Sequence, residues 1–541
     1  MIALYPKRFS IQYLILFNIL LVLFSGCSKK QSQFNDNQVF RYNEHSNILS
    51  LDPAFAKDMS DIWAVNQIYN GLVQLDDSLN IKPDIAKSWQ VSEDGKEYTF
   101  VLRNDVFFHK NVAFGAKETR KVVASDFEYS FKRLSDKQVA SPGKWTMNLV
   151  ADIDAVNDTL LKIQLEQPFP PFLGMLGMKY CSVIPKEAVA FYDNDFRSNP
   201  VGTGPFYLKL WEENTKLVLR KNPLYFEKDE QGQQLPYLEA VAITFLPDKQ
   251  SEFLQFIQGR LDFLNSIDPS YKDDLLTPEG NLRARYQQDI RIQKIPFLNT
   301  EYLGVYLPDS LNPLSNRLLR KAVNHGFDRE KMIMYLRNGI GEPGTNGFLP
   351  KGLPGYVEQK GFSYDPALAK SLVEQYRQET GSQQVSISIT TNSQYVDLCE
   401  FIQRELENVG ITVKIDVVPP STLRQMKANG KAAIFRASWI ADYPDAENYF
   451  TLFYSKNFAP NGPNYTHFKN SDFDAYYEQA IQLVDEKSRY VMYRKMDSLI
   501  IAESPVIPLY YDEVVRFTQK NIVGMGVNPT NLLILKSVKK N

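Results

Sequence analysis

The residues best placed to do chemistry lie in the stretch 435–449, where Arg436, Trp439 and Asp442 come close together just before Pro444. The run 435–441 predicts a short strand, and Pro444 predicts its end, because proline fixes φ and removes a hydrogen-bond donor. A carboxylate at such a strand end can meet the ammonium group of a ligand. We therefore interpret this stretch as a strand that grips a ligand.

Side chains alternate between the two faces of a strand, so Arg436, Ser438 and Ile440 would share one face and Trp439 the other. The backbone N–H and C=O groups before Asp442 would then be available to pair with an extended ligand. An aspartate at the end of a strand is also a common solvated turn residue. On these residues alone, the binding and structural interpretations both stay open.

Several other kinds of chemistry lack support. The chain has no Gly-x-Ser-x-Gly, His-Glu-x-x-His or Cys-x-x-Cys motif, and its four histidines stand far apart, at positions 45, 109, 325 and 467. The segment Gly202-Thr-Gly-Pro205 lacks the third glycine and the Lys-Ser or Lys-Thr of nucleotide-binding loops. A net charge of −2 gives no support for nucleic-acid binding. We expect no enzymatic activity, no metal site and no cofactor.

The N-terminus resembles a bacterial lipoprotein signal. Lys7 and Arg8 precede an apolar run over 14–24, which is shorter than the roughly 20 residues of a membrane span. The small residues Ser25 and Gly26 then lead to Cys27, although Phe24 departs from the small aliphatic residue usual before them. The pattern implies cleavage after residue 26, a lipid on Cys27 and a flexible tether over 27–37. The alternative is an uncleaved N-terminal anchor, and either one holds the protein at the outer face of a membrane, in the periplasm or on the cell surface.

The other two cysteines are interpreted as free thiols. Cys399 shares one face of a predicted helix over 396–409 with Val396, Ile402 and Leu406, which indicates a small core residue. A chain of this length buries a sufficient core without disulfides. We therefore expect Cys181 and Cys399 to be unpaired.

Hydrophobic periodicity predicts an α/β protein with two or three lobes, since the chain is too long for a single core. Strands are expected over 38–43, 160–165, 215–221 and 241–246, and Asp94-Gly95 predicts a hairpin turn within 89–103. Helices are expected over 61–69, 126–134 (capped by Ser125) and 251–258.

Helical periodicity dominates the second half of the chain. Helices are expected from residue 316, over 328–337, 365–378, 472–484 and 487–503, and an apolar strand over 506–511. The order strand 385–390, helix 396–409 and strand 412–417 is a β–α–β unit, which predicts a parallel pair of strands in this region.

Eight short motifs connect the whole mature chain to one known family. They are Leu51-Asp-Pro53, Ile68-Tyr-Asn-Gly-Leu72, Asp84-Ile-Ala-Lys-Ser-Trp89, Asp94-Gly95, Phe100-Val-Leu-Arg103, Gly202-Thr-Gly-Pro205, Arg320-Lys-Ala322 with Asp328-Arg329, and 439–445. In this order they resemble the family 5 extracytoplasmic solute-binding proteins, and most of all the oligopeptide-binding component of ABC peptide importers.

The resemblance implies a two-lobed clamshell of the periplasmic-binding-protein type II fold with an inserted α/β subdomain. The first lobe would comprise 38–71, 200–297 and 510–541, the inserted subdomain 72–199, and the second lobe 298–509. Such lobes close on a ligand by hinge motion. The resemblance further implies a monomer that captures short peptides and delivers them to ABC transporter permease subunits.

The resemblance also implies roles for individual residues. Asp442 matches the carboxylate that receives the N-terminal ammonium of the peptide, and Arg436 matches an arginine available to its C-terminal carboxylate. Two segments would pair with the peptide backbone. They are Ser438, Trp439 and Ile440 in one lobe and, by position only, Lys57, Asp58 and Met59 in the other.

Alternative functions stay open on the same fold. The family also includes carriers of nickel chelates, haem, glutathione and oligosaccharides, although scarce histidines argue against a metal. A surface-displayed receptor or adhesin is a further alternative. Trp439, Tyr443 and Tyr449 either line side-chain pockets or fill the core.

Overall fold

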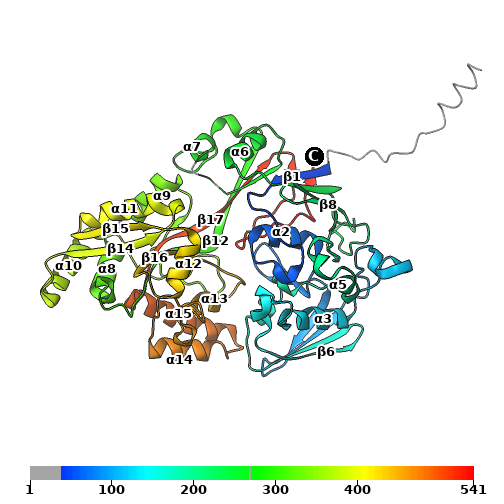
Figure 1. Ribbon diagram of the computed structural model, residues 1–541, viewed down its shortest axis with the longest axis horizontal. Coiled ribbons are helices and arrows are strands. Elements are labelled where there is room, and N and C mark those ends of the chain that lie inside the picture. Colours follow the sequence, from blue (N-terminus) through cyan, green and yellow to red (C-terminus); the bar gives the residue numbers. More distant parts are fainter. Residues whose placement is uncertain (1–37, 267, 269) are drawn as a thin grey trace, which may run out of the picture.

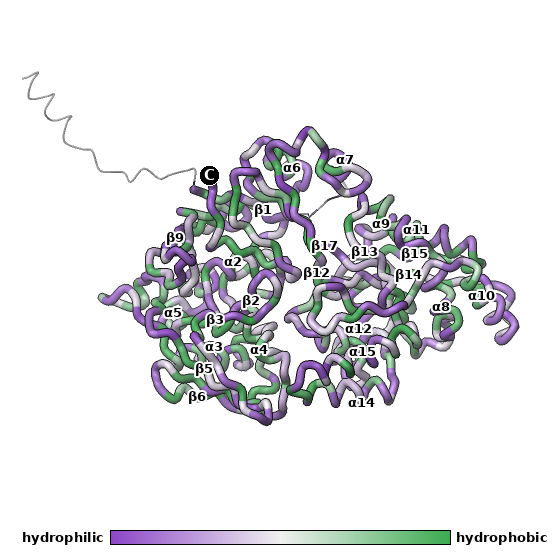
Figure 2. The backbone as a smooth tube through the Cα atoms, turned by 180° about the vertical axis from the view of Figure 1, so that it is seen from behind, coloured by the Kyte–Doolittle hydropathy of each residue, from purple (hydrophilic) through white to green (hydrophobic). Residues whose placement is uncertain are grey.

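The computed structural model describes residues 38–266, 268 and 270–541. The predicted signal peptide, the tether and Cys27 lie outside the described residues. Two halves of the molecule lie side by side, and the long strands β12 (Ile290–Val305) and β17 (Val506–Gln519) run between them (Figure 1). The reverse view shows the same arrangement, with hydrophilic segments at the outer rim of both halves (Figure 2).

The first half contains two four-stranded sheets over one shared hydrophobic core. One sheet joins distant segments in the order β1 (Val39–Asn43), β10 (Ala240–Thr244), β9 (Lys216–Lys221) and β8 (Phe206–Glu212). The other sheet is a local antiparallel meander in the order β4 (Ala86–Val91), β5 (Glu97–Leu102), β7 (Leu160–Leu165) and β6 (Val150–Asn157). The predicted hairpin at Asp94-Gly95 is therefore confirmed, with Tyr98, Phe100 and Leu102 buried in alternation.

Helices surround these sheets, and short elements complete the half. The helices are α2 (Met59–Ile68), α3 (Ala124–Ser135), α4 (Phe172–Met175) and α5 (Lys186–Tyr192). Two further helices, α6 (Lys249–Ile257) and α7 (Lys272–Leu275), pack in a separate core cluster against β12 and β17. β2 (Val73–Leu75) and β3 (Ile81–Pro83) form a small hairpin, and β18 (Ile522–Val523) pairs with the distant β19 (Lys539–Lys540) in a two-stranded antiparallel sheet.

The start of α3 differs from its prediction. Ser125 is not the cap, because the helix begins at Ala124, one residue before it. The carboxylate of Asp126 accepts a 2.9 Å hydrogen bond from the backbone N–H of Val123, which satisfies one of the unpaired donors of the first turn. An acid in the first turn thus takes the role that the sequence assigned to the serine.

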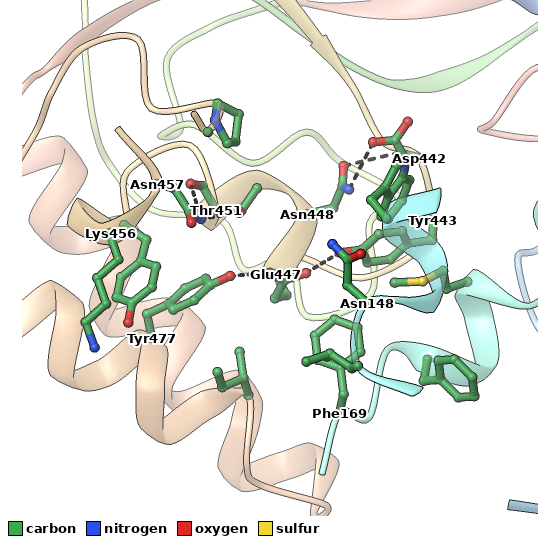
Figure 3. Close-up of a pocket in the computed structure, with 18 of the residues that line it drawn as sticks. Asn148, Phe169, Asp442, Tyr443, Glu447, Asn448, Thr451, Lys456, Asn457 and Tyr477 are labelled. Atoms are coloured by element: carbon green, nitrogen blue, oxygen red, sulfur yellow. Dashed lines mark hydrogen bonds between the residues drawn. The ribbon is translucent and has the colours of Figure 1, made fainter. Parts of the chain in front are cut away.

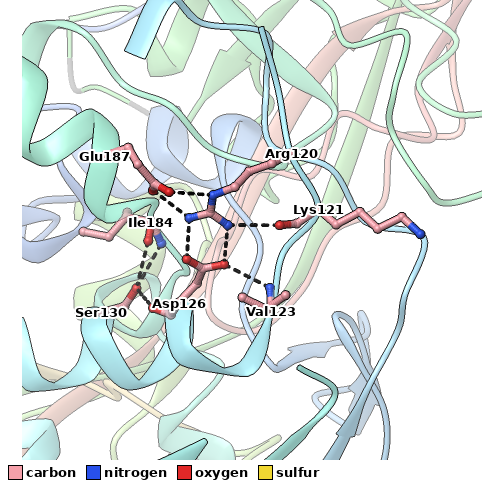
Figure 4. A network of polar contacts seen from close by, with 7 residues as sticks. All are labelled: Arg120, Lys121, Val123, Asp126, Ser130, Ile184 and Glu187. Carbon is pink, nitrogen blue, oxygen red and sulfur yellow. Dashed lines mark hydrogen bonds and ion pairs between the residues drawn. The ribbon is translucent and has the colours of Figure 1, made fainter. Parts of the chain in front are cut away.

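An arginine network fixes the position of α3 against α5 (Figure 4). Arg120 donates to Asp126 of α3 at 2.7 and 2.8 Å and to Glu187 of α5 at 2.7 and 2.9 Å. Its guanidinium also lies 5.0 Å from the ring centroid of Phe108. Planar bidentate contacts of this kind specify geometry as well as adding energy, so one side chain sets the angle between the two helices.

The second half is built on a seven-stranded mixed sheet. Its order is β11 (Phe263–Asn265), β17, β12, β16 (Ile434–Ile440), β14 (Val385–Thr391) and β15 (Ile411–Val417), and β13 (Glu342–Pro343) also pairs with β17. β14 and β15 are parallel and are connected by α11 (Val396–Glu407), so the predicted β–α–β unit is confirmed.

The remaining helices belong to this half. They are α8 (Arg317–His325), α9 (Arg329–Arg337), α10 (Pro366–Thr380), α12 (Pro420–Ala428), α13 (Glu447–Phe450), α14 (Ser471–Ala480) and α15 (Glu486–Glu503). Asp328 caps α9 through the backbone N–H of Lys331, at the predicted position. α12 and α13 had not been predicted, because α12 begins at two prolines and α13 has only four residues.

The strands β12 and β17 are the largest difference between the predicted and the observed fold. The expected strand over 506–511 is the first part of a strand of 14 residues, and β12 extends over 16 residues. The boundaries placed by sequence at 297/298 and 509/510 fall inside these two strands. The β12–β17 ladder shifts register between Pro296 and Thr300, so the pair is interrupted next to both boundaries.

Cys181 and Cys399 are buried free thiols, as expected. Across the described ranges, no helix is long and apolar enough to span a membrane. The described residues also contain no group of three or more histidine, cysteine or acidic side chains arranged to hold a metal ion.

Candidate functional site

A cavity of about 740 Å³ lies between the two halves, at the end of β16 (Figure 3). One wall comes from the segment 145–175 of the first half, and the other from the segment 439–482 of the second half. The halves touch beside it, since the rings of Trp145 and Tyr443 are 6.2 Å apart between centroids. The volume lies within the range of sites for small ligands.

Asp442 stands at the end of β16 and lines this cavity. Its side chain reaches solvent through the opening, but the surrounding protein atoms withdraw bulk water and raise the pKa of its carboxyl, which a hydrogen bond from Asn448 partly offsets. Within the described chain, no cation forms an ion pair with Asp442. Its charge therefore remains available to a ligand cation.

Asn448 holds the end of the strand in place. Its side-chain oxygen accepts hydrogen bonds from the Trp439 indole at 3.0 Å and from the backbone N–H of Asp442 at 3.2 Å. Its side-chain nitrogen donates to the Asp442 carboxylate at 3.3 Å. Asn448 is buried and lines the cavity, so this amide orients the carboxylate towards the opening.

The backbone of β16 has one open edge. The N–H of Ala441 donates to the carbonyl of Leu298 on the β12 side at 2.9 Å. Backbone groups of successive residues point to opposite edges of a strand in an antiparallel pair. Ser438 and Ile440 therefore direct their N–H and C=O groups away from β12.

Little of the protein covers that outer edge. In the described part of the chain, β14 pairs with β16 at one position, where Thr390 lies opposite Phe435. Ser438 and Trp439 are half-buried, and Ile440 is exposed. The predicted segment 438–440 is therefore an unpaired strand edge that leads directly to Asp442.

Arg436 lies in a different environment from the one expected. It is buried, forms an ion pair with Glu301 of β12, and lies with its guanidinium 3.2 Å from the ring centroid of Tyr395. Nearby charges favour its charged form, so the pKa of Arg436 is raised despite burial. Its charge is already balanced by a carboxylate of the protein, and its role towards a ligand carboxylate stays a prediction.

The segment Lys57 to Met59 belongs to the other half, at the start of α2. Lys57 and Asp58 are exposed, and Met59 is half-buried. Burial raises the pKa of the nearby Tyr180 to about 12, and the charges of Asp442 and Asp58 add to the effect.

A second carboxylate lines the same cavity. Glu447 is buried and accepts hydrogen bonds from the hydroxyls of Tyr443 and Tyr477 (Figure 3). Burial raises the pKa of Glu447 to about 7, while the two tyrosine hydrogen bonds lower it. Glu447 lies within the stretch 435–449, but nothing in the sequence alone predicts a role for it.

The structure therefore brings together only part of the predicted set. Trp439 and Asp442 line the cavity, Ser438 and Ile440 form the strand edge beside it, and Arg436 lies deeper in the sheet. Tyr443 lines the cavity, and Tyr449 fills the core. The sequence alone does not indicate the cavity residues in the first half, such as Trp145 and Phe169, because they precede Asp442 by more than 250 residues.

Comparison with known proteins identifies the family. Residues 80–461 match the model of the bacterial extracellular solute-binding proteins, family 5 Middle. The chain belongs to this family. It is an extracytoplasmic solute-binding protein of an ABC transporter and not an enzyme, as the sequence predicted. A glutathione-binding protein GsiB from Salmonella choleraesuis (strain SC-B67) is 25% identical over 493 residues, which cover 90% of this chain and 91% of that protein.

Solved structures of the family have the same fold. The periplasmic binding protein DppA from Helicobacter pylori, in complex with the peptide STSA, aligns with a TM-score of 0.77 and 26% identity over 93% of this chain and 98% of that one. Haemophilus influenzae OppA, in complex with RPPGFSPFR, aligns with a TM-score of 0.73 and 20% identity over 94% and 100% of the respective chains. The predicted periplasmic-binding-protein fold class is thus confirmed.

Proposed function

We propose that this solute-binding protein captures short peptides in extended form between its two halves for import. The peptide backbone pairs with the open edge of β16 at Ser438 and Ile440, and its N-terminal ammonium meets Asp442. The observation that carries the proposal is the continuity of these two features: an unpaired strand edge ends at an uncompensated carboxylate inside the inter-lobe cavity.

The chemistry of this arrangement favours peptides over other solutes. Backbone pairing along a strand edge gives affinity without reading side chains. An ammonium–carboxylate pair at one end is charge-assisted and fixes the direction and register of the ligand. A sugar offers neither a backbone ladder nor an ammonium group, so it would leave the charge of Asp442 without a counter-ion.

The lobes of the proposed clamshell follow the predicted boundaries, with 38–71, 200–297 and 510–541 in the first, 72–199 inserted in it, and 298–509 in the second. Closure would bend β12 and β17, where their ladder shifts register between Pro296 and Thr300. A register shift removes the regular hydrogen bonds that stiffen a pair of strands, which supports a hinge at this place.

Delivery completes the proposed function. The ligand-loaded monomer would dock on ABC permease subunits while a lipid on Cys27 holds it at the membrane, and residues 27–37 would act as its tether. Peptide-bound DppA, as a relative of 26% identity over nearly the whole chain, supports this assignment.

Glutathione is a second candidate, since curated relatives of about 25% identity are named glutathione-binding proteins. In glutathione the first residue is joined through its side chain and keeps an α-carboxylate beside its ammonium. The acidic side chains Asp442 and Glu447 of the cavity would repel this carboxylate. We therefore place glutathione behind peptides with an ordinary first peptide bond.

Mass spectrometry of the ligands released by denaturation tests the proposal. The mature protein, purified from peptide-rich cells without its lipid anchor, should release a narrow ladder of short peptides with mixed sequences. Release of glutathione alone would support the second candidate. A single non-peptide species, or no ligand after repeated preparations, would overturn the peptide assignment.

A further inference from the structure

The cavity beside Asp442 carries more negative charge than a peptide backbone can use. Its charged side chains among the described residues are the carboxylates of Asp442, Glu447 and Glu478 and the ammonium of Lys456. Lys456 pairs with Glu478 at 2.8 Å, and Tyr454 also donates to Glu478, at 2.6 Å. These contacts leave Asp442 and Glu447 without a cation.

One ligand ammonium cannot satisfy both carboxylates by charge. The N-terminus of a bound peptide supplies a single positive charge, which the proposed function assigns to Asp442. Glu447 accepts from two tyrosine hydroxyls, one on each carboxylate oxygen, and each oxygen retains a further lone pair. Those hydrogen bonds orient the carboxylate but bring no charge to it.

The walls next to Glu447 suit an alkyl stem that ends in a cation. Tyr454 and Tyr477 stack on each other with ring centroids 4.4 Å apart, and Lys456 already lies over the Tyr454 ring. The aromatic surface left for a ligand comes from Trp145, Phe169 and Trp439, which line other parts of the same cavity. Aromatic faces attract cations and also accept the methylene groups of a long side chain. Figure 3 shows Glu447 between Tyr477 and Tyr443. Glu447 is buried, whereas the side chain of Lys456 is exposed.

We infer that the cavity beyond Asp442 is a specificity pocket for a basic side chain on the first residue of the peptide, with Glu447 as its counter-ion. The inference rests on the proposed function, because Asp442 must first fix the N-terminus at the mouth of this pocket. The ligand class is then a peptide with two adjacent cations, its terminal ammonium and a lysine-type or arginine-type side chain.

The test compares two tripeptides by isothermal titration calorimetry at pH 8, Lys-Ala-Ala and norleucine-Ala-Ala. Norleucine keeps the straight alkyl stem and lacks the ammonium. We expect the wild-type protein to bind the lysine peptide at least about tenfold more tightly than the norleucine peptide. This factor lies at the lower end of the range for desolvated charge pairs. The variant Glu447→Gln keeps the shape; its amide oxygen can still accept from one tyrosine hydroxyl, and its amide nitrogen can donate to the other. It should reduce this ratio to less than about threefold.

A matched control removes one positive and one negative charge from the same cavity, so the net charge of the cavity stays the same. The double variant Lys456→Gln/Glu478→Gln deletes a pair that is already neutral, so it should keep the preference for lysine. A preference lost equally in this double variant would overturn the role of Glu447.

The outcomes separate the inference from the proposed function. Equal affinity of the two peptides for the wild-type protein would overturn the basic pocket and leave peptide capture intact. Failure of both peptides to bind would contradict the proposed function itself. Circular dichroism of Glu447→Gln shows whether the variant is folded, and the wild-type ratio tests the pocket without any variant.

Discussion

Asn448 donates a 3.3 Å hydrogen bond from its side-chain amide to the carboxylate of Asp442, six residues earlier in the chain. The same side chain accepts from the Trp439 indole and from the backbone of Asp442. One buried amide therefore ties the last residues of β16 to the start of α13. The direction in which Asp442 faces depends on this contact.

Loss of the Asp442 charge should remove most of the affinity for peptides with a free amine. We expect Asp442→Asn to raise the dissociation constant by at least about tenfold, because an ammonium would be held in the closed cleft without its counter-ion. Calorimetry with a free peptide and its N-acetylated form checks this. The acetylated form should bind wild type and variant equally weakly, and a variant that still prefers the free amine would exclude this role.

Asn448 should act on binding through Asp442. We expect Asn448→Ala to weaken the binding of free-amine peptides by about two- to tenfold, which is the range for the loss of one or two hydrogen bonds. Asn457→Ala is the matched control, since Asn457 lines the same cavity but bonds Thr451. Equal losses in the two variants, measured by titration, would contradict a specific role for Asn448.

The Arg436–Glu301 pair should contribute to stability because both groups are buried. Glu301→Gln leaves the guanidinium without its counter-ion, and we expect a loss of about 3–5 kcal/mol in the free energy of unfolding. Chemical denaturation measures this loss. The double variant Glu301→Gln/Arg436→Met removes both charges and should recover a large part of it, whereas additive losses would argue against coupling.

The stability of the folded protein should decrease as the pH rises, because of Glu44. Burial raises the pKa of Glu44 to about 8, and the charges of Glu252 and Asp61 add to the effect. A folded pKa above the unfolded value means that the protonated form contributes stability below about pH 4.5, and that this contribution is lost as the pH rises to about 8. Glu44→Gln should therefore gain stability relative to wild type between pH 5 and pH 8. Thermal unfolding at these two pH values checks the sign, and an unchanged difference would contradict it.

Binding of a lysine-first peptide should release protons near pH 7. Burial raises the pKa of Glu447 to about 7, while the hydrogen bonds from Tyr443 and Tyr477 lower it. The negative charges of Asp445 and Asp442 also raise this pKa. A ligand cation favours the ionised carboxylate, so it lowers this pKa and releases protons on binding. Calorimetry in two buffers of different ionisation enthalpy measures the release. Glu447→Gln should abolish it, and the norleucine peptide should show less of it.

Much of the architecture was predictable from local patterns. The β–α–β unit at β14, α11 and β15 follows from hydrophobic periodicity, and the start of α9 follows from the capping residue Asp328. The predicted cap of α3 was wrong because the carboxylate of Asp126 accepts from the backbone N–H of Val123, so the helix begins before Ser125. Arg120, which also bonds Glu187 of α5, holds that carboxylate in place. The long strands were missed since alternation fades where both faces are buried.

The sequence by itself determined the family, the fold class, a strand over 435–441, observed at Ile434–Ile440, and the position of Asp442 at its end. These depend on local residue types and their order. The tertiary structure decided which charges are free. It balances Arg436 with Glu301, leaves Asp442 open and places Glu447 in the wall of the same cavity. Ion pairs form between side chains distant in sequence, and their energy depends on distance and burial, which no local pattern encodes.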